Sequence, residues 1–424
     1  MQQATQTPTD FANPHALSSI MRASEHCEIV AQEDIVDENG TKLWPRNQPV
    51  SQALQQRLLE RKLRQPLESC LRAANGVTHA DLSEHARCLV DSDTALHSAV
   101  GPWATDLLSD IPRLPLHPVA QLLLTAARSG LPGAFDHAVQ GMLVAGAMAL
   151  HAGGDRYQQR ISMLGGLLHD LGELYIQPDY LMAERSLTPV AWRHIVVHPK
   201  VGELLLQRQT DYPRELSRAV GEHHERGNGL GYPSRARYLS WLGCRLSAME
   251  TFLGVLASGN PDSWEHASLA VRIIPGEFDT TAVSFASQAA RRHQGHGRMA
   301  PCPDAAQVWD HAQRLKHGIQ SALREAWVLA ASSTSAKVSG TARLVTPILE
   351  QLMRACDALG LWAPRHLAGE HLHELHLACQ EISHRVRSLE RISCWLDDAW
   401  QPQEAEEIAQ LWQGLTHEAL AEVA

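Results

Sequence analysis

The feature that most constrains this chain is a group of histidines, one of them followed by an aspartate, at the ends of successive predicted helices. Leucines recur at helical spacing over residues 161–171, and His169 and Asp170 fall near the end of that helix. His223 and His224 share the apolar face of a later amphipathic helix. Each buried imidazole needs a polar partner, and a bound metal satisfies several at once. The candidate metal ligands are His137, His169, Asp170, His198, His223 and His224.

The composition of the chain indicates a folded, acidic protein of two or three domains. Its 424 residues exceed the roughly 150 of one domain, and 44% hydrophobic with 20% charged residues exclude a disordered chain. The net charge of −10 argues against duplex nucleic acid as the main partner, so an anionic ligand needs a local attractor. The 24 histidines outnumber all aromatic residues together, and histidine is the commonest metal ligand.

Cysteine usage and the absence of long apolar runs predict a soluble cytoplasmic protein. The eight cysteines are scattered and form no C-x-x-C pair, which argues against a zinc ribbon or a disulfide framework. The first residues lack the basic patch and apolar run of a signal peptide. The most apolar stretch, residues 141–150, is shorter than the roughly 18 residues of a membrane span.

Five segments are predicted along the chain. Residues 1–24 are polar and rich in Thr, Gln and Pro, which predicts a disordered leader. Residues 25–77 combine short β-type runs around a DENG turn with a basic helix, and predict a small α+β module. Residues 78–130 predict a helical connector, residues 131–296 a set of medium helices joined by Gly- and Pro-marked loops, and residues 303–424 a C-terminal helical bundle.

Three motifs resemble the HD-GYP domain phosphodiesterases, a branch of the HD metal-dependent phosphohydrolases. They are LLHDLGELYIQPDYL at residues 167–181, LTPVAWRHIVVHPKVGELLL at 187–206 and HHERGNGLGYP at 223–233. The resemblance covers roughly residues 131–296. It implies a mainly α fold, in which an all-helical HD-GYP domain is flanked by the small N-terminal α+β module and the C-terminal helical bundle.

The resemblance also implies the ligands and the chemistry. Two divalent metal ions, iron or manganese, would hydrolyse the bacterial messenger cyclic di-GMP in signal transduction. His137, His169 and Asp170 would hold one ion, with Asp170 bridging to the second. The other ligands of the second ion would be His198, His223 and His224. His169 and Asp170 would thus form the catalytic centre.

Several positions depart from the family pattern. Glu173 stands where the family has a phosphate-contacting Lys, which exchanges an attraction for a repulsion; it is either a compensating ligand or acid, or a loss of function. The last metal-binding carboxylate would be Glu250, which is otherwise a surface or capping residue. Residues 258–267 lack the Arg that usually follows, and Gly133 replaces the Glu of a third metal. We expect two metals at most.

The GNGLGYP motif predicts a substrate-facing loop. Gly229 and Gly231 permit positive φ and Pro233 restricts the turn, so these residues shape the loop. Tyr232 either belongs to this shape or stacks on guanine.

The sequence is compatible with three functions. The first is a cyclic di-GMP phosphodiesterase. The second is a degenerate, catalytically weak HD-GYP module that acts through protein partners of the N-terminal module and the C-terminal helices. The third is an HD hydrolase of another phosphate ester, since a fold does not determine its substrate. Metal identity, the input signal and a possible homodimer are not decided by these residues.

Overall fold

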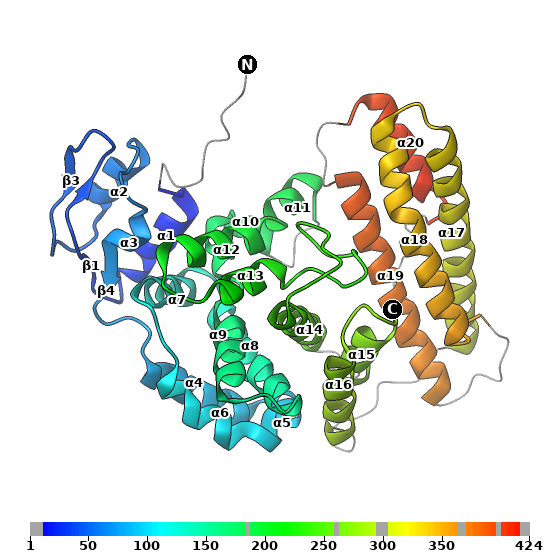
Figure 1. The fold of residues 1–424 in the computed structure, drawn as a ribbon, viewed down its shortest axis with the longest axis horizontal. Helices are drawn as coiled ribbons and strands as arrows, with labels where there is room; N and C mark the ends of the chain where they lie inside the picture. Colours follow the sequence, from blue (N-terminus) through cyan, green and yellow to red (C-terminus); the bar gives the residue numbers. More distant parts are fainter. Residues whose placement is uncertain are drawn as a thin grey trace. The chain divides into compact units, whose positions relative to one another are not determined.

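The computed structural model describes residues 12–182, 187–257, 263–293, 304–362, 370–395 and 400–415, and this part of the chain is mainly α-helical (Figure 1). The chain divides into two compact units. The first comprises Met1–Leu187, His194–His224 and Ser240–Met249, and the second comprises Thr188–Arg193, Glu225–Leu239 and Glu250–Ala424. The five predicted segment boundaries are not the boundaries of these units and stay predictions.

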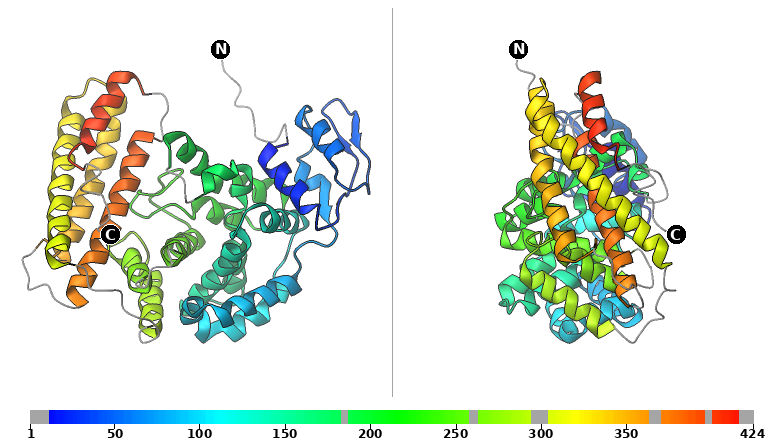
Figure 2. Two further views of the ribbon diagram at one scale, coloured as in Figure 1. Left: turned by 180° about the vertical axis from the view of Figure 1, so that it is seen from behind. Right: turned by 90° about the vertical axis from the view of Figure 1, so that its right-hand side faces the viewer.

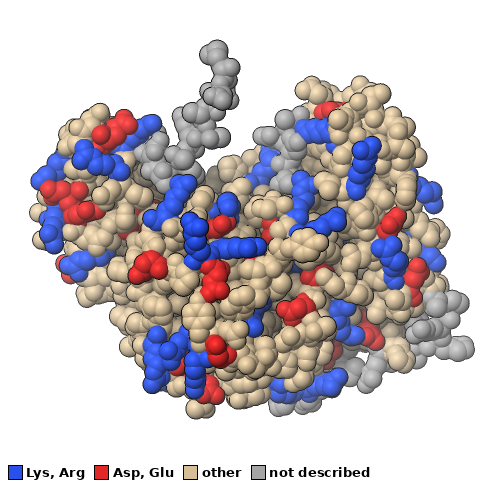
Figure 3. Space-filling model, in the orientation of Figure 1, with Lys and Arg blue, Asp and Glu red and all other residues tan. Residues whose placement is uncertain are grey.

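The first unit begins with the predicted small α+β module. Its elements are α1 (Pro14–Ala23), β1 (Ile29–Ala31), β2 (Ile35–Val36), β3 (Lys42–Trp44), α2 (Gln52–Leu59), α3 (Leu67–Cys70) and β4 (Leu71–Ala73). β1 pairs antiparallel with β4, and β2 pairs antiparallel with β3. Gly40 closes the predicted turn between β2 and β3 at φ +86°, a conformation that favours glycine. Acidic and basic side chains intermix over this module in Figure 3, as expected for a solvated surface.

The expected disordered leader is wrong for its described part, because residues 14–23 form helix α1. The Asn13 side chain accepts hydrogen bonds from the backbone N–H groups of His15 and Ala16, which caps the helix. Leu17 and Ile20 are buried, and α1 packs against α7 (Pro118–Gly130) of the same unit. An Asn-Pro start followed by apolar residues at helical spacing therefore outweighs the polar composition. Residues 1–11 lie outside the described residues.

The rest of the first unit consists of short and medium helices. Between the module and α7 lie α4 (His79–Ser92), α5 (Thr94–Val100), η1 (Gly101–Trp103), α6 (Ala104–Asp110) and η2 (Ile111–Arg113). After α7 follow α8 (Ala134–His151), α9 (Arg156–Leu168), η3 (Leu171–Tyr175), α10 (Pro178–Leu181), α12 (His198–Gln209) and α13 (Arg214–Glu222). Between α10 and α12 the chain forms α11 (Pro189–Ile195), whose residues up to Arg193 belong to the second unit. Pro189, Pro199 and Pro213 lie at the starts of α11, α12 and α13, as the sequence predicts.

The second unit contains the predicted C-terminal helical bundle. α14 (Trp241–Leu256) runs from the first unit into the second, where α15 (Ser263–Arg272) and α16 (Thr280–His293) follow. The bundle consists of α17 (Ala305–Ser332), α18 (Ala336–Ala358), α19 (Glu370–Trp395) and α20 (Pro402–Trp412), which run beside one another in Figure 2. Its core is apolar and includes Ile319, Leu349 and Ile382, each fully buried.

Within the described residues, no helix is long and apolar enough to cross a membrane. The cysteines of this part of the chain are all free thiols, in agreement with the expectation that no disulfide framework is present. Cys302 lies outside the described residues.

Candidate metal centre

The first unit brings the six predicted histidine and aspartate ligands together from the ends of helices. His169 directly follows α9, and Asp170 is the next residue. The remaining ligands come from the first turn of α8, the start of α12 and the end of α13, and are His137, His198, His223 and His224.

Glycines permit the close backbone contacts that bring these helix ends together. Gly141 of α8 faces Gly166 of α9, and a Cβ at Gly166 would lie 2.1 Å from the Gly141 carbonyl oxygen. A Cβ at Gly172 of η3 would lie 2.0 Å from the carbonyl oxygen of His198 at the start of α12. Any side chain larger than hydrogen would force these elements apart, because protein interiors are closely packed.

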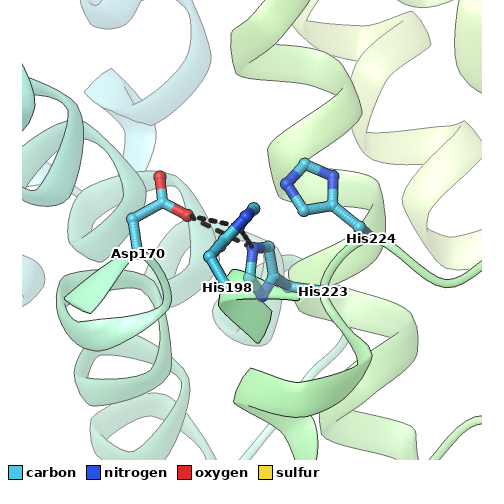
Figure 4. Close-up of side chains that lie close together, drawn as sticks. All are labelled: Asp170, His198, His223 and His224. Atoms are coloured by element: carbon cyan, nitrogen blue, oxygen red, sulfur yellow. Dashed lines mark hydrogen bonds and ion pairs between the residues drawn. The ribbon is translucent and has the colours of Figure 1, made fainter. Parts of the chain in front are cut away.

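The two carboxylate oxygens of Asp170 face two different pairs of imidazoles. Oδ2 lies 3.3 Å from Nε2 of His137 and 3.0 Å from Nε2 of His169. Oδ1 lies 3.4 Å from Nε2 of His198 and 3.2 Å from Nε2 of His223 (Figure 4). A carboxylate in this position can bridge two metal ions.

Hydrogen bonds to the backbone orient three of the rings. Nδ1 of His169 donates to the Gly166 carbonyl at 2.8 Å, Nδ1 of His198 to that of Ile195 at 2.7 Å, and Nδ1 of His223 to that of Val220 at 2.6 Å.

With the proton on Nδ1, Nε2 of each ring presents its lone pair to the cluster, as a metal ligand requires. The residue that accepts the bond precedes each histidine by three positions. In each case the helix that precedes the ligand therefore orients it.

The fourth histidine of the second group, His224, lies beside this cluster. Its ring centroid is 5.0 Å from that of His198 and 4.4 Å from that of His223. Ligand atoms of Asp170, His198, His223 and His224 all lie within 4.8 Å of one another. The same limit holds for His137, His169 and Asp170, so Asp170 belongs to both groups.

Burial and charge oppose each other at Asp170. Burial is the largest influence and raises the pKa of this carboxyl, but the charge of His169 and hydrogen bonds from the surrounding imidazoles hold the pKa well below its usual range. Burial lowers the pKa of His198, yet the Asp170 carboxylate raises it above its ordinary value. At His223 burial prevails and the pKa is lowered. Asp170 is therefore ionised and His223 is neutral at neutral pH.

The donor set fits a cation. Asp170 Oδ1 is buried and makes no hydrogen bond within the part of the chain that the structure describes. Nε2 of His198 and Nε2 of His223 are 3.1 Å apart, although each ring already donates from Nδ1. Two ring nitrogens and an anionic oxygen lie at such short distances that a divalent ion among them would satisfy all three at once.

The residues that depart from the family pattern lie at three different elements of the fold. Glu173 lies on η3, and its negative charge contributes to the raised pKa of His198. Gly133 precedes α8 at φ +77°, a left-handed conformation that a Glu would adopt only with strain. Glu250 follows Met249 on α14, at the first position of the last segment of the second unit, and its assignment as a ligand stays a prediction.

The GNGLGYP loop belongs to the second unit and is held by an acidic residue that sequence reasoning missed. The buried carboxylate of Glu225 accepts hydrogen bonds from the backbone N–H groups of Ser234 at 2.6 Å and Ala236 at 2.8 Å. A Cβ at Gly231 would lie 2.3 Å from the Glu225 Cα. The only signal in the sequence is an acidic residue directly before a loop rich in glycine.

The other loop residues fit the loop-shaping interpretation. Gly229 has φ +81°, and Pro233 follows Tyr232 through a cis peptide bond. The Tyr232 ring packs edge-on against Trp192, with centroids 6.1 Å apart. Its stacking on guanine stays a prediction.

Comparison with known families identifies the fold around this cluster. The family model of the HD domain matches residues 134–249, which include all six clustered ligands. Residues 134–249 form an HD domain. The match covers about a quarter of the chain and ends one residue before Glu250.

Two curated relatives match short parts of the chain. The 3'3'-cGAMP-specific phosphodiesterase 3 of Vibrio cholerae is 34% identical over 67 residues, which is 16% of this chain and 14% of that protein. The cyclic di-GMP phosphodiesterase response regulator RpfG of Xanthomonas campestris pv. campestris is 33% identical over 91 residues, which is 21% of this chain and 24% of that protein. The chain thus matches a quarter or less of the length of each relative. No solved structure matches the chain significantly.

Proposed function

We propose that this protein is a metal-dependent phosphodiesterase of the HD-GYP type that hydrolyses cyclic di-GMP. The observation that carries the proposal is the orientation of Asp170, whose two oxygens face two separate pairs of imidazoles. Supporting it, both relatives are named as phosphodiesterases, one for cyclic di-GMP and one for 3'3'-cGAMP.

The ligands divide into two sets that share Asp170. His137, His169 and Asp170, with Glu250 as a fourth ligand, would hold one iron or manganese ion. The second ion would be held by Asp170, His198, His223 and His224. Two such ions supply a bound water of lowered pKa and neutralise charge on the phosphoryl oxygens.

The protein's own side chains orient the metal ligands and leave one side of the cluster exposed. His169, His198 and His223 have side chains that are at most 1% exposed, whereas the side chains of His137 and Asp170 are 27% and 19% exposed. A phosphodiester therefore approaches the cluster from the side of His137 and Asp170. Hydrogen bonds from Nδ1 keep the buried rings in one orientation during this approach.

Glu173 favours a second candidate, a degenerate module with weak or no turnover. Its carboxylate lies close enough to the cluster to influence His198, and a negative charge there repels a phosphate. Such a module would bind metal and act through protein partners. Cytoplasmic location, protein partners of the flanking regions and a homodimer stay predictions, as does hydrolysis of another phosphate ester.

The first experiment measures metal content and hydrolysis of cyclic di-GMP and 3'3'-cGAMP with added Mn²⁺ or Fe²⁺. Two ions per chain together with turnover support the proposal. Asp170→Ala should then abolish both the metal binding and the turnover. His317→Ala on α17 is the matched control, since this exposed histidine lies in the other unit and should leave both unchanged. Turnover that survives in Asp170→Ala would refute the assignment.

A second variant, Glu173→Lys, separates the two candidates. A large gain in turnover indicates that Glu173 weakens an otherwise complete phosphodiesterase site. Metal binding without turnover in either protein favours the noncatalytic module or a different substrate.

A further inference from the structure

The first unit contains a cavity, between the N-terminal module and α12, that the proposed reaction does not use. One wall is the face of α12 that carries Val201, Leu204 and Leu205, and the facing wall includes Leu63 and Leu67 of the module. The volume is about 180 Å³. A dry cavity of roughly 150 Å³ holds a molecule the size of benzene, so this one accommodates a small ring.

One polar atom in this apolar wall has no hydrogen-bond partner among the described residues. Oε1 of Gln209, at the end of α12, is buried and unpaired, and Gln209 lines the cavity. A buried acceptor without a donor is destabilising by about 1–3 kcal/mol. A ligand that donates one hydrogen bond to this atom would remove the penalty.

The charged side chains around the cavity favour a neutral ligand. Glu68 is buried, and one of its carboxylate oxygens already accepts a hydrogen bond from the Tyr175 hydroxyl. Arg208 lies at the rim and is exposed, so it contributes the opposite charge where water screens it. A neutral molecule with an apolar body meets neither repulsion nor an unpaired buried charge.

The walls of the cavity continue into the metal centre. Val197 lines the cavity and directly precedes His198, while Tyr175 lies at the end of η3, which begins directly after Asp170. Gly172 packs closely against the His198 carbonyl, so η3 and α12 are in direct backbone contact. A ligand that shifts α12 would therefore move His198 and, through the contact with η3, would also act on Asp170.

We propose that this cavity binds a small, neutral, mainly apolar molecule with one N–H or O–H donor, and that binding changes the metal affinity of the HD domain. The first half of the proposal is independent of the enzyme assignment. The second half rests on the metal centre proposed above.

Indole and benzofuran test the binding half, because they have nearly the same shape and only indole has an N–H donor. Binding to the full chain is measured by ligand-observed NMR and calorimetry. Gln209→Leu should weaken indole binding about tenfold and leave benzofuran binding unchanged. The matched control is Gln207→Leu, two residues away on the same helix with an exposed side chain, and it should change neither.

A third variant, Val201→Trp, fills the cavity and should abolish the binding of both probes. Circular dichroism checks that it folds; if it does not, the comparison of Gln209→Leu with Gln207→Leu decides alone. Absence of indole binding to the unmodified protein at millimolar concentration overturns the proposal, as does equal binding to all variants.

Titration with Mn²⁺, followed by electron paramagnetic resonance, tests the coupling half. Saturating indole should change the Kd for Mn²⁺ at least threefold in the unmodified protein and should leave it unchanged in Val201→Trp, which binds no indole. An unchanged Kd overturns the coupling. A protein that binds indole but no Mn²⁺ refutes the proposed function, and with it the coupling, while the binding half stands.

Discussion

A single methyl group at Gly172 should separate the two elements that carry Asp170 and His198. The added Cβ would lie 2.0 Å from the His198 carbonyl oxygen and 2.9 Å from the Gly202 nitrogen. Real Cβ contacts are essentially never shorter than 3.0 Å, so η3 and α12 must move apart by about 1 Å. Overpacking of this kind destabilises a protein by about 1–3 kcal/mol, and disturbed support of a ligand lowers metal affinity about 10- to 100-fold.

The assay compares Gly172→Ala with Gly340→Ala. Gly340 lies inside α18, and a Cβ there would meet no atom within 4 Å, so its substitution should be neutral or stabilising by about 0.5–1 kcal/mol. Urea unfolding gives the stability and equilibrium dialysis gives the Mn²⁺ affinity. If Gly172→Ala kept both the stability and the Mn²⁺ affinity of the unmodified protein, the close contact would not position His198 and the reasoning would fail.

Three further substitutions test other parts of the molecule. Burial raises the pKa of Glu381, but the charge of Arg385 and a hydrogen bond from His266 hold it at about 2, below the unfolded value of 4.5. This carboxylate thus stabilises the fold above about pH 4.5 and less as the pH falls toward 2. Glu381→Gln should reduce the slope of urea-measured stability in that window by up to about 1.4 kcal/mol per pH unit, and an unchanged slope speaks against the ion pairs. Gly133→Glu should lower the stability measured by urea unfolding by about 1–2 kcal/mol, because φ +77° strains a residue that has a side chain, and unchanged stability would contradict this strain. Glu225→Gln should destabilise the loop that follows it by about 1.5–3 kcal/mol, because two backbone N–H groups lose a charged acceptor. Amide hydrogen exchange measures this, and unchanged protection would contradict it.

The sequence alone determined which side chains could bind metal and on which helices they lie. Helical spacing and proline positions are local signals, because a repeat of 3.6 residues and a restricted φ act within a few positions. For this reason the starts of α11, α12 and α13 and the residue types of the cluster could be predicted. Local polarity misled the prediction only at α1, where Leu17 and Ile20 are buried against a helix more than ninety residues away in the chain.

The tertiary structure decided how those side chains meet. No local signal shows that the two oxygens of Asp170 face different imidazole pairs, because the partners come from α8, α12 and α13. The acceptors of the Nδ1 bonds, the locking of Gly172 on His198 and the unpaired oxygen of Gln209 likewise depend on how helices pack. Ligand identity is a property of residues, whereas ligand geometry and enclosed volume are properties of packing between distant segments, and these arise only when the chain folds.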